Sequence, residues 1–182
     1  MRCVGLVVLF AARVAWGQEG VFLTEPEAPR AVFPTADAIA RDDVAVTAER
    51  RARVTAALAG AVPSLWEDHW LVFRATQGAT PLGRAIVVEE IGKHRPITFV
   101  VGVRPDRTIA DVAVMAYREA YGSEIRSRRF IAQYAGKGAD ADLRQPVGIR
   151  NVAGATLSVE AASRAVRKAQ AIAAVLDAEA GR

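Results

Sequence analysis

A short run of residues places a threonine hydroxyl where a phosphate group could be bound. Residues 151–158 read Asn-Val-Ala-Gly-Ala-Thr-Leu-Ser, and a helical pattern follows at once. The first turn of a helix has backbone N–H groups without intrahelical partners and a positive partial charge, so a phosphate beside it gains hydrogen bonds and a favourable field. Gly154 and Ala155 keep the approach to Thr156 open. The run therefore favours a site where a phosphate is held and joined to the Thr156 hydroxyl over the alternative, a helix-entry loop of small residues for packing.

The helix after this loop follows from the spacing of apolar residues. They recur every three or four positions from Val159 to Leu176, which predicts a helix over residues 159–178 with Ser158 as its N-cap. Three basic residues lie off this apolar stripe and are expected on a solvated face: Arg164, Arg167 and Lys168. The helix is expected to pack on a sheet through its apolar side.

A second Gly-Ala-Thr occurs at residues 78–80 and serves as an internal control. Thr80 is followed by Pro81 and lies between two strand-like runs, so it is expected at the tip of a hairpin. No helix follows it to receive an anion. The sequence context therefore favours Thr156 over Thr80 as a phosphate site.

The rest of the chain predicts an α+β fold. Four runs rich in β-branched and aromatic residues, 70–76, 84–89, 97–103 and 109–117, are joined by short links, which indicates a meandering antiparallel sheet. Short helices are expected at 47–59 and 127–135, a turn at 104–107 and a loop at 137–148. The long C-terminal helix is expected to pack on the sheet.

The start of the chain has the pattern of a secretion signal. Arg2 precedes an apolar stretch over residues 3–12, and Ala15-Trp16-Gly17 offers small residues for cleavage after Gly17. The stretch is too short to span a bilayer. We therefore expect a signal peptide at 1–17, an extension or linker at 18–46 and a domain at 47–182. The expected compartment is a bacterial periplasm.

Composition and charge narrow the classes of function. Cys3, the only cysteine, lies in the predicted signal, so a mature chain would have no thiol or disulfide. Removing Arg2 and Arg13 from the formal charge of +4 leaves +2, without a basic stripe of the kind that binds nucleic acid. His69 and His94 have no His or Cys at metal-ligand spacing, so no metal site is expected.

Further landmarks accompany the Gly-Ala-Thr run. They are Glu90–Lys93, Pro96–Phe99, Tyr117–Glu119 with Gly122, and Gly136-Lys137. With these landmarks, the stretch from about Trp70 to Ala174 resembles the FMN-binding domains related to the flavoprotein subunits of the sodium-pumping NADH:quinone oxidoreductase and the Rnf complex. The resemblance implies FMN as cofactor, linked through its phosphate to Thr156 by an ApbE-type flavin transferase.

The resemblance also implies a set of cofactor-binding residues, which are Thr156, Ala155, Gly154, Leu157, Ser158, Glu119, Gly122 and Lys93. Glu119 has two readings, a cofactor-site carboxylate or a group that caps a turn or pairs with Arg118. Lys93 either offsets phosphate charge or is a solvated turn residue. No catalytic acid–base pair is visible, so a redox carrier is favoured over an independent enzyme.

Two positions depart from the family motif, because Arg150 stands where the family has an acid and Ala153 where it has Ser or Thr. The expected function is electron transfer by a secreted FMN carrier with a membrane or haem-containing redox partner. The alternative is a periplasmic binding or assembly module of the same fold without flavin.

Overall fold

The computed structural model describes residues 20–58 and 63–181, and the predicted signal lies outside this part of the chain. The helices are α1 (Ala28–Val32), α2 (Ala48–Ala57), α3 (Arg128–Ile131) and α4 (Thr156–Ala180), with the short 3-10 turns η1 (Ser123–Arg126) and η2 (Ala132–Tyr134) flanking α3. The strands are β1 (Ala38–Ala45), β2 (His69–Gln77), β3 (Thr80–Ile91), β4 (Pro96–Val103) and β5 (Ile109–Ala116).

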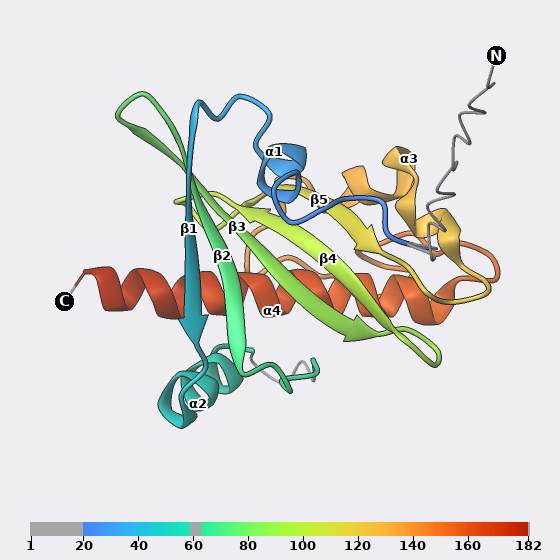
Figure 1. Ribbon diagram of the computed structural model, residues 1–182. Helices are drawn as coiled ribbons and strands as arrows, with labels where there is room; N and C mark the ends of the chain where they lie inside the picture. Colours follow the sequence, from blue (N-terminus) through green and yellow to red (C-terminus); the bar gives the residue numbers. More distant parts are fainter. Residues whose placement is uncertain (1–19, 59–62, 182) are drawn as a thin grey trace, which may run out of the picture.

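The strands form one antiparallel sheet in sequence order, β1-β2-β3-β4-β5. Helix α4 runs along one face of this sheet, which confirms the predicted α+β architecture (Figure 1). The β2–β3 connection turns through Gly78 at φ +57°, so Thr80 lies beside a hairpin turn, as predicted. The predicted turn at 104–107 is also present, closed by a hydrogen bond from the Arg107 N–H to the Arg104 carbonyl.

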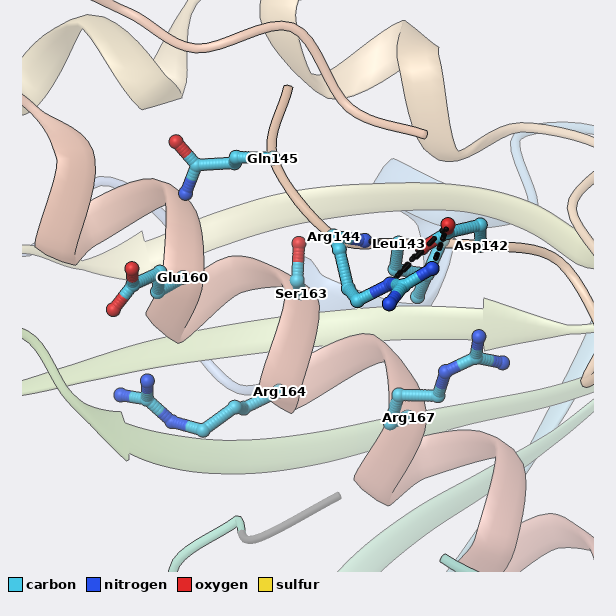
Figure 2. Close-up of a pocket in the computed structure, with 8 residues that line it drawn as sticks. All are labelled: Asp142, Leu143, Arg144, Gln145, Glu160, Ser163, Arg164 and Arg167. Carbon is cyan, nitrogen blue, oxygen red and sulfur yellow. Dashed lines mark hydrogen bonds and ion pairs between the residues drawn. The ribbon is translucent and has the colours of Figure 1, made fainter. Parts of the chain in front are cut away.

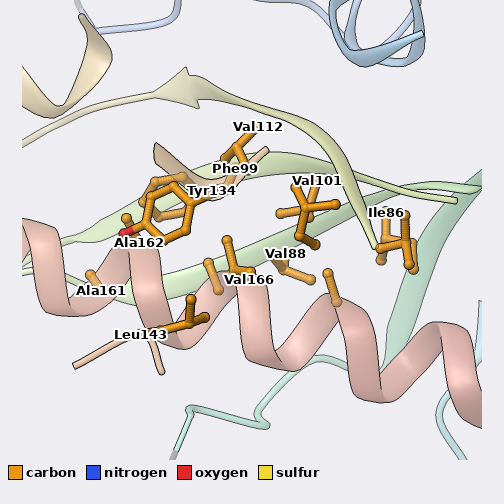
Figure 3. Packing of buried hydrophobic residues seen from close by; sticks show 14 of the residues in the cluster. Ile86, Val88, Phe99, Val101, Val112, Tyr134, Leu143, Ala161, Ala162 and Val166 are labelled. Atoms are coloured by element: carbon orange, nitrogen blue, oxygen red, sulfur yellow. The ribbon is translucent and has the colours of Figure 1, made fainter. Parts of the chain in front are cut away.

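The main core lies between α4 and the sheet. Alternate residues of β3 and β4, such as Ile86, Val88, Phe99 and Val101, point at α4 and are fully buried (Figure 3). On the helix, small residues including Ala162 let the helix lie close to the sheet. Burial of apolar surface at about 25 cal/mol per Å² makes this layer the main source of stability.

The opposite face of the sheet is covered by α1 and the chain around it. Val32 and Phe33 are buried against Phe73, Val100 and neighbouring side chains of the sheet. This part of the chain therefore packs back onto the sheet. The stretch 18–46, read from sequence as an extension or linker, also contains β1, which pairs with β2 at the sheet edge.

Helix α4 begins earlier than predicted. Ala155 is its N-cap residue without a side-chain cap, and its carbonyl accepts the Val159 N–H at 2.9 Å. The prediction that Ser158 caps the helix is wrong, because the Ser158 hydroxyl is buried and hydrogen-bonds the Tyr117 hydroxyl at 2.9 Å. Thr156 is consequently the first residue of the helix rather than the last part of the loop.

Lys168 is also placed differently from the prediction. Instead of facing solvent, its side chain is fully buried, bonded to Glu67 and 3.8 Å from a carboxylate oxygen of Glu90. Arg164 pairs with the same Glu90 at 3.1 Å. Burial raises the pKa of the Glu90 carboxyl above its ordinary value, although the two cations act in the opposite direction. An ionic cluster therefore fastens the middle of α4 to β3.

The other predicted elements are close to their expected positions. Thr47 caps α2 by accepting the Arg50 N–H, and Ser127 caps α3 by accepting the Phe130 N–H. Gly136 follows η2 at φ +76°, and an irregular loop leads on to α4. Within the described residues, no helix has the length and apolar character needed to cross a membrane.

Candidate functional site

A cavity of about 560 Å³ opens at the start of α4. Its walls come from the β3–β4 turn, from the segment that follows β5 and from residues 154–158. Six of the eight predicted cofactor residues line it, namely Lys93, Glu119, Gly154, Thr156, Leu157 and Ser158. Segments more than 60 residues apart in sequence therefore meet at the Gly-Ala-Thr run.

Thr156 presents its side chain at the mouth of this cavity. The residue is exposed, and its hydroxyl oxygen accepts a hydrogen bond from the Asn151 side-chain amide at 3.1 Å. The Gln145 side-chain amide donates to the Thr156 carbonyl at 3.2 Å. As the first residue of α4, Thr156 stands beside N–H groups that have no intrahelical partner. An accessible hydroxyl and the positive end of a helix are thus combined at one point.

Gly122 and Ala155 lie behind the cavity wall rather than on it. Gly122 adopts φ +89°, and a Cβ there would stand 2.7 Å from both the Ser158 hydroxyl oxygen and the Tyr117 hydroxyl oxygen. Ala155 is buried, and the Cβ added at Gly122 would also lie 3.3 Å from the Cβ of Ala155. These two residues therefore let the chain pass closely under the first turn of α4.

Glu119 caps the β3–β4 turn. One oxygen of its carboxylate accepts the backbone N–H groups of His94 at 2.5 Å and Arg95 at 2.9 Å. Partial burial raises the pKa of the Glu119 carboxyl, but these N–H groups and that of Lys93 outweigh it, and the pKa lies below its ordinary value. Of the two readings from sequence, the structure shows the turn-capping contact, at a carboxylate that also lines the cavity.

Lys93 is exposed on the same turn, and in the described part of the chain its ammonium group has no acid partner. Three other cavity residues were not predicted: His94, Ala120 and Tyr121. His94 follows the Gly92-Lys93 turn and Tyr121 precedes Gly122, so both are sequence neighbours of predicted residues. Asn151 was also missed as a partner of the Thr156 hydroxyl.

The departure at position 150 has a clear structural setting. Arg150 is exposed, its backbone N–H donates to the Gln133 side chain at 2.9 Å, and its side chain lines a neighbouring hollow of about 310 Å³ with Arg129. Asn151, the next residue, is the one that contacts Thr156. The replacement of an acid by Arg150 therefore leaves the immediate support of the Thr156 hydroxyl in place.

Another cavity, of about 440 Å³, lies farther along α4 (Figure 2). Its basic residues are already engaged, because Arg144 pairs with Asp142, Arg164 with Glu90, and Arg167 donates to two backbone carbonyls. These contacts favour a structural role for this cavity. Within the described residues, no group of His, Cys, Asp and Glu side chains is arranged to hold a metal ion.

Comparison with known proteins gives a family for the segment that builds the cavity. The model of the FMN-binding domain matches residues 92–171, which run from the β3–β4 turn into α4. This segment belongs to the FMN-binding domain family. FMN is its cofactor, as the resemblance in sequence had implied. No curated protein matches the chain.

The fold has a counterpart among solved structures. The crystal structure of Shewanella oneidensis NqrC superimposes with a TM-score of 0.53 and 15% sequence identity, covering 81% of this chain and 88% of that chain. At this identity the match concerns the fold. The shared architecture extends over most of both chains, so the fold they have in common includes elements on both sides of the segment matched by the family model.

The residues around the cavity fit FMN. A volume of about 560 Å³ lies within the range of roughly 300–1,000 Å³ that small-ligand sites occupy. The first turn of α4 supplies N–H groups for a phosphate, and Lys93 supplies a cation. Tyr121 and Leu157 add exposed apolar surface, being 83% and 44% exposed. The wall thus combines anion-binding groups with surface suited to an aromatic ring.

Proposed function

We propose that this protein is a periplasmic electron carrier whose FMN is joined by a phosphoester bond to Thr156. The observation that carries the proposal is the exposed Thr156 hydroxyl at the first residue of α4, inside a cavity of suitable size and within a segment of the FMN-binding family. When bound, FMN supplies the redox chemistry. The protein supplies attachment, orientation and the surrounding charge.

Each group of side chains has a distinct task in this proposal. The first-turn N–H groups and Lys93 hold the phosphate, and Asn151 orients the Thr156 hydroxyl by donating to its oxygen. Glu119 keeps the β3–β4 turn in place beneath Lys93 by accepting the N–H groups of His94 and Arg95. Ser158 and Tyr117 fix the first turn of α4 against the segment after β5.

The attachment is tested by co-expression with a flavin transferase of the ApbE type. Thr156→Val is expected to abolish the mass increment of one FMN less water in the intact denatured protein, while the fold is retained. Thr80→Val is the matched control, because Thr80 is an exposed threonine in the other Gly-Ala-Thr of the chain. Denaturation-resistant flavin in Thr156→Val would contradict the proposed attachment. A parent protein that stays colourless would favour the flavin-free binding module.

The periplasmic location rests on the predicted signal at residues 1–17. Cell fractionation and N-terminal sequencing are expected to find a periplasmic protein that begins near Gln18. A product that keeps Met1 and sediments with membranes would show an anchor instead. A phosphoester bond suits this compartment, because a covalently held flavin cannot diffuse away between encounters with a membrane or haem-containing partner.

A further inference from the structure

A group of exposed cations surrounds the flavin cavity and the neighbouring hollow. We call it the basic rim. Lys93, Arg129 and Arg150 line the two hollows, and Arg95, Arg118 and Arg126 are exposed residues next in sequence to lining residues. The two hollows adjoin, since Asn151 lines the smaller one and donates to Thr156 in the larger. Three segments distant in sequence thus bring positive charge to one end of the molecule.

The cations of the basic rim are not neutralised from within the chain. In the described residues, none of the six side chains forms an ion pair, and Arg126 instead lies over the Phe22 ring at 3.2 Å from its centroid. Glu119 and Glu124 are the acids that line the two hollows. Apart from these six cations and two acids, and without Arg2 and Arg13 of the predicted signal, the sequence has 16 Lys or Arg and 18 Asp or Glu. The formal surplus of the chain therefore resides on the rim.

The basic rim also encloses exposed apolar surface. Tyr121 is 83% exposed and Leu157 44% exposed, both at the cavity mouth, and Phe22 is 41% exposed under Arg126. Apolar contacts with charges around them are typical of protein interfaces, in which the charges steer the encounter and the apolar centre holds the complex. The two hollows give this end a concave relief that a protruding protein surface fits better than a flat bilayer.

We propose that the basic rim is the docking face for an acidic electron-transfer protein, one with carboxylates around its own redox centre. This inference rests on the proposed function, since electron exchange requires the partner's redox centre to approach the flavin at the cavity. Unpaired cations attract such a partner over distance, which raises association rates by about 10- to 1,000-fold at low ionic strength. The partner's carboxylates then pair with arginines that lack acids of their own.

The test measures electron transfer from the reduced FMN-loaded protein to an acidic c-type cytochrome and to a basic one by stopped flow. With the acidic cytochrome, the second-order rate constant is expected to fall steeply as salt rises. Arg95→Glu/Arg129→Glu is expected to lower it about tenfold at low salt. Arg107→Glu/Lys137→Glu is the matched control, with the same charge change away from the cavity, and should change the rate by less than about twofold.

Separate measurements distinguish the possible failures. Flavin content is determined for each variant first, and a parent protein without flavin would overturn the proposed function. Binding of the acidic cytochrome to the immobilised chain then still tests the rim, because it needs no flavin. Rates and binding that are independent of salt and of the rim variants would overturn the docking proposal. The docking proposal would also be overturned if the chain bound phosphatidylglycerol-containing vesicles through the rim, but bound neither phosphatidylcholine vesicles nor the cytochrome. That result would assign the face to a membrane.

Discussion

The two ends of α4 use charge in opposite ways. At the C-terminal end, Glu179 accepts hydrogen bonds from Arg50 and Arg53, and Asp177 pairs with Arg84. Cations from α2 and β3 are matched there by acids of the helix. At the N-terminal end, the basic rim surrounds the Thr156 cavity without acid partners among the described residues. The contrast indicates that one end anchors the helix, whereas the other carries the candidate flavin site and the proposed docking face.

The start and the middle of α4 also differ in how closely the surrounding chain packs and in whether a cavity is present. The start of α4 passes close to Gly122, whose φ is +89°, and lies beside an opening of about 560 Å³. The middle of the helix is fastened by the buried pairing of Lys168 with Glu67 and Glu90. Substitutions in α4 far from Thr156 should therefore change stability without changing flavin loading, whereas substitutions close to Thr156 should change flavin loading.

The largest effect is expected in the middle of the helix. Lys168→Met leaves the carboxylates of Glu67 and Glu90 without their shared cation, and should lower the free energy of unfolding by about 3 kcal/mol, measured by urea denaturation at pH 7. The pKa of Glu90 is already raised in the folded state and would rise further, so stability should recover as pH falls towards 4.5. The double variant Lys168→Met/Glu90→Gln should recover part of the loss at pH 7. An unchanged unfolding curve for Lys168→Met would show that the ionic cluster does not anchor α4.

Gly122→Ala should affect both stability and flavin loading. Its Cβ would stand 2.7 Å from the Ser158 and Tyr117 hydroxyl oxygens, so the first turn of α4 must shift, and the strained backbone alone costs about 1–2 kcal/mol. Gly136→Ala is the control, because Gly136 has φ +76° but no atom within 4 Å of an added Cβ. Equal loading and equal stability of the two variants would mean that close packing at Gly122 does not support the site.

Asn151→Ala should slow flavin loading without changing stability. It removes a hydrogen bond to the Thr156 hydroxyl, worth about 1 kcal/mol or roughly fivefold in rate, followed by mass spectrometry over a time course. Asn151→Asp separates the two roles of this side chain. It keeps the acceptor for the Val152 N–H and loses the donor to Thr156, so it should load as slowly as Asn151→Ala. Normal loading of Asn151→Asp would assign Asn151 to the turn alone.

The smallest effect is expected at the C-terminal end. Glu179→Gln weakens two ion pairs whose side chains are partly exposed, so it should cost no more than about 1 kcal/mol in thermal unfolding. Flavin content and electron-transfer rates should match those of the parent protein. A change in loading would show that the two ends of α4 are coupled and would weaken the comparison.

Periodicity in the sequence predicted the buried parts of the fold better than its edges. The strands β2 to β5 and most of α4 follow from apolar spacing, because both are packed against the main core. Strand β1 was missed, since it lies at the edge, is largely exposed and carries Asp42 and Asp43, which disfavour strands. The conformation of β1 is determined by its hydrogen bonds to β2 rather than by the residue pattern of β1 itself.

Long-range pairing explains the errors along α4. A periodic pattern treats Lys168 as a surface residue, but its partner Glu67 is 101 residues away in the sequence. Likewise, the Ser158 hydroxyl bonds Tyr117, 41 residues away, and so cannot serve as the helix cap. At the site, the Gly-Ala-Thr run located Thr156, whereas Tyr121 and His94 became visible only when the turn, the segment after β5 and α4 were brought together.

The order of the strands has a consequence for how the protein matures. A sheet in which every strand pairs with its neighbour in sequence can form early from local contacts, whereas α4 must return across the whole sheet to close the core. The flavin cavity needs the β3–β4 turn and the start of α4 together, so it is complete only when this last, non-local step has occurred. Chains that have not finished folding would offer Thr156 to a transferase without its pocket. If the proposed transferase requires the pocket, it loads only fully folded chains, and flavin content then reports completed folding.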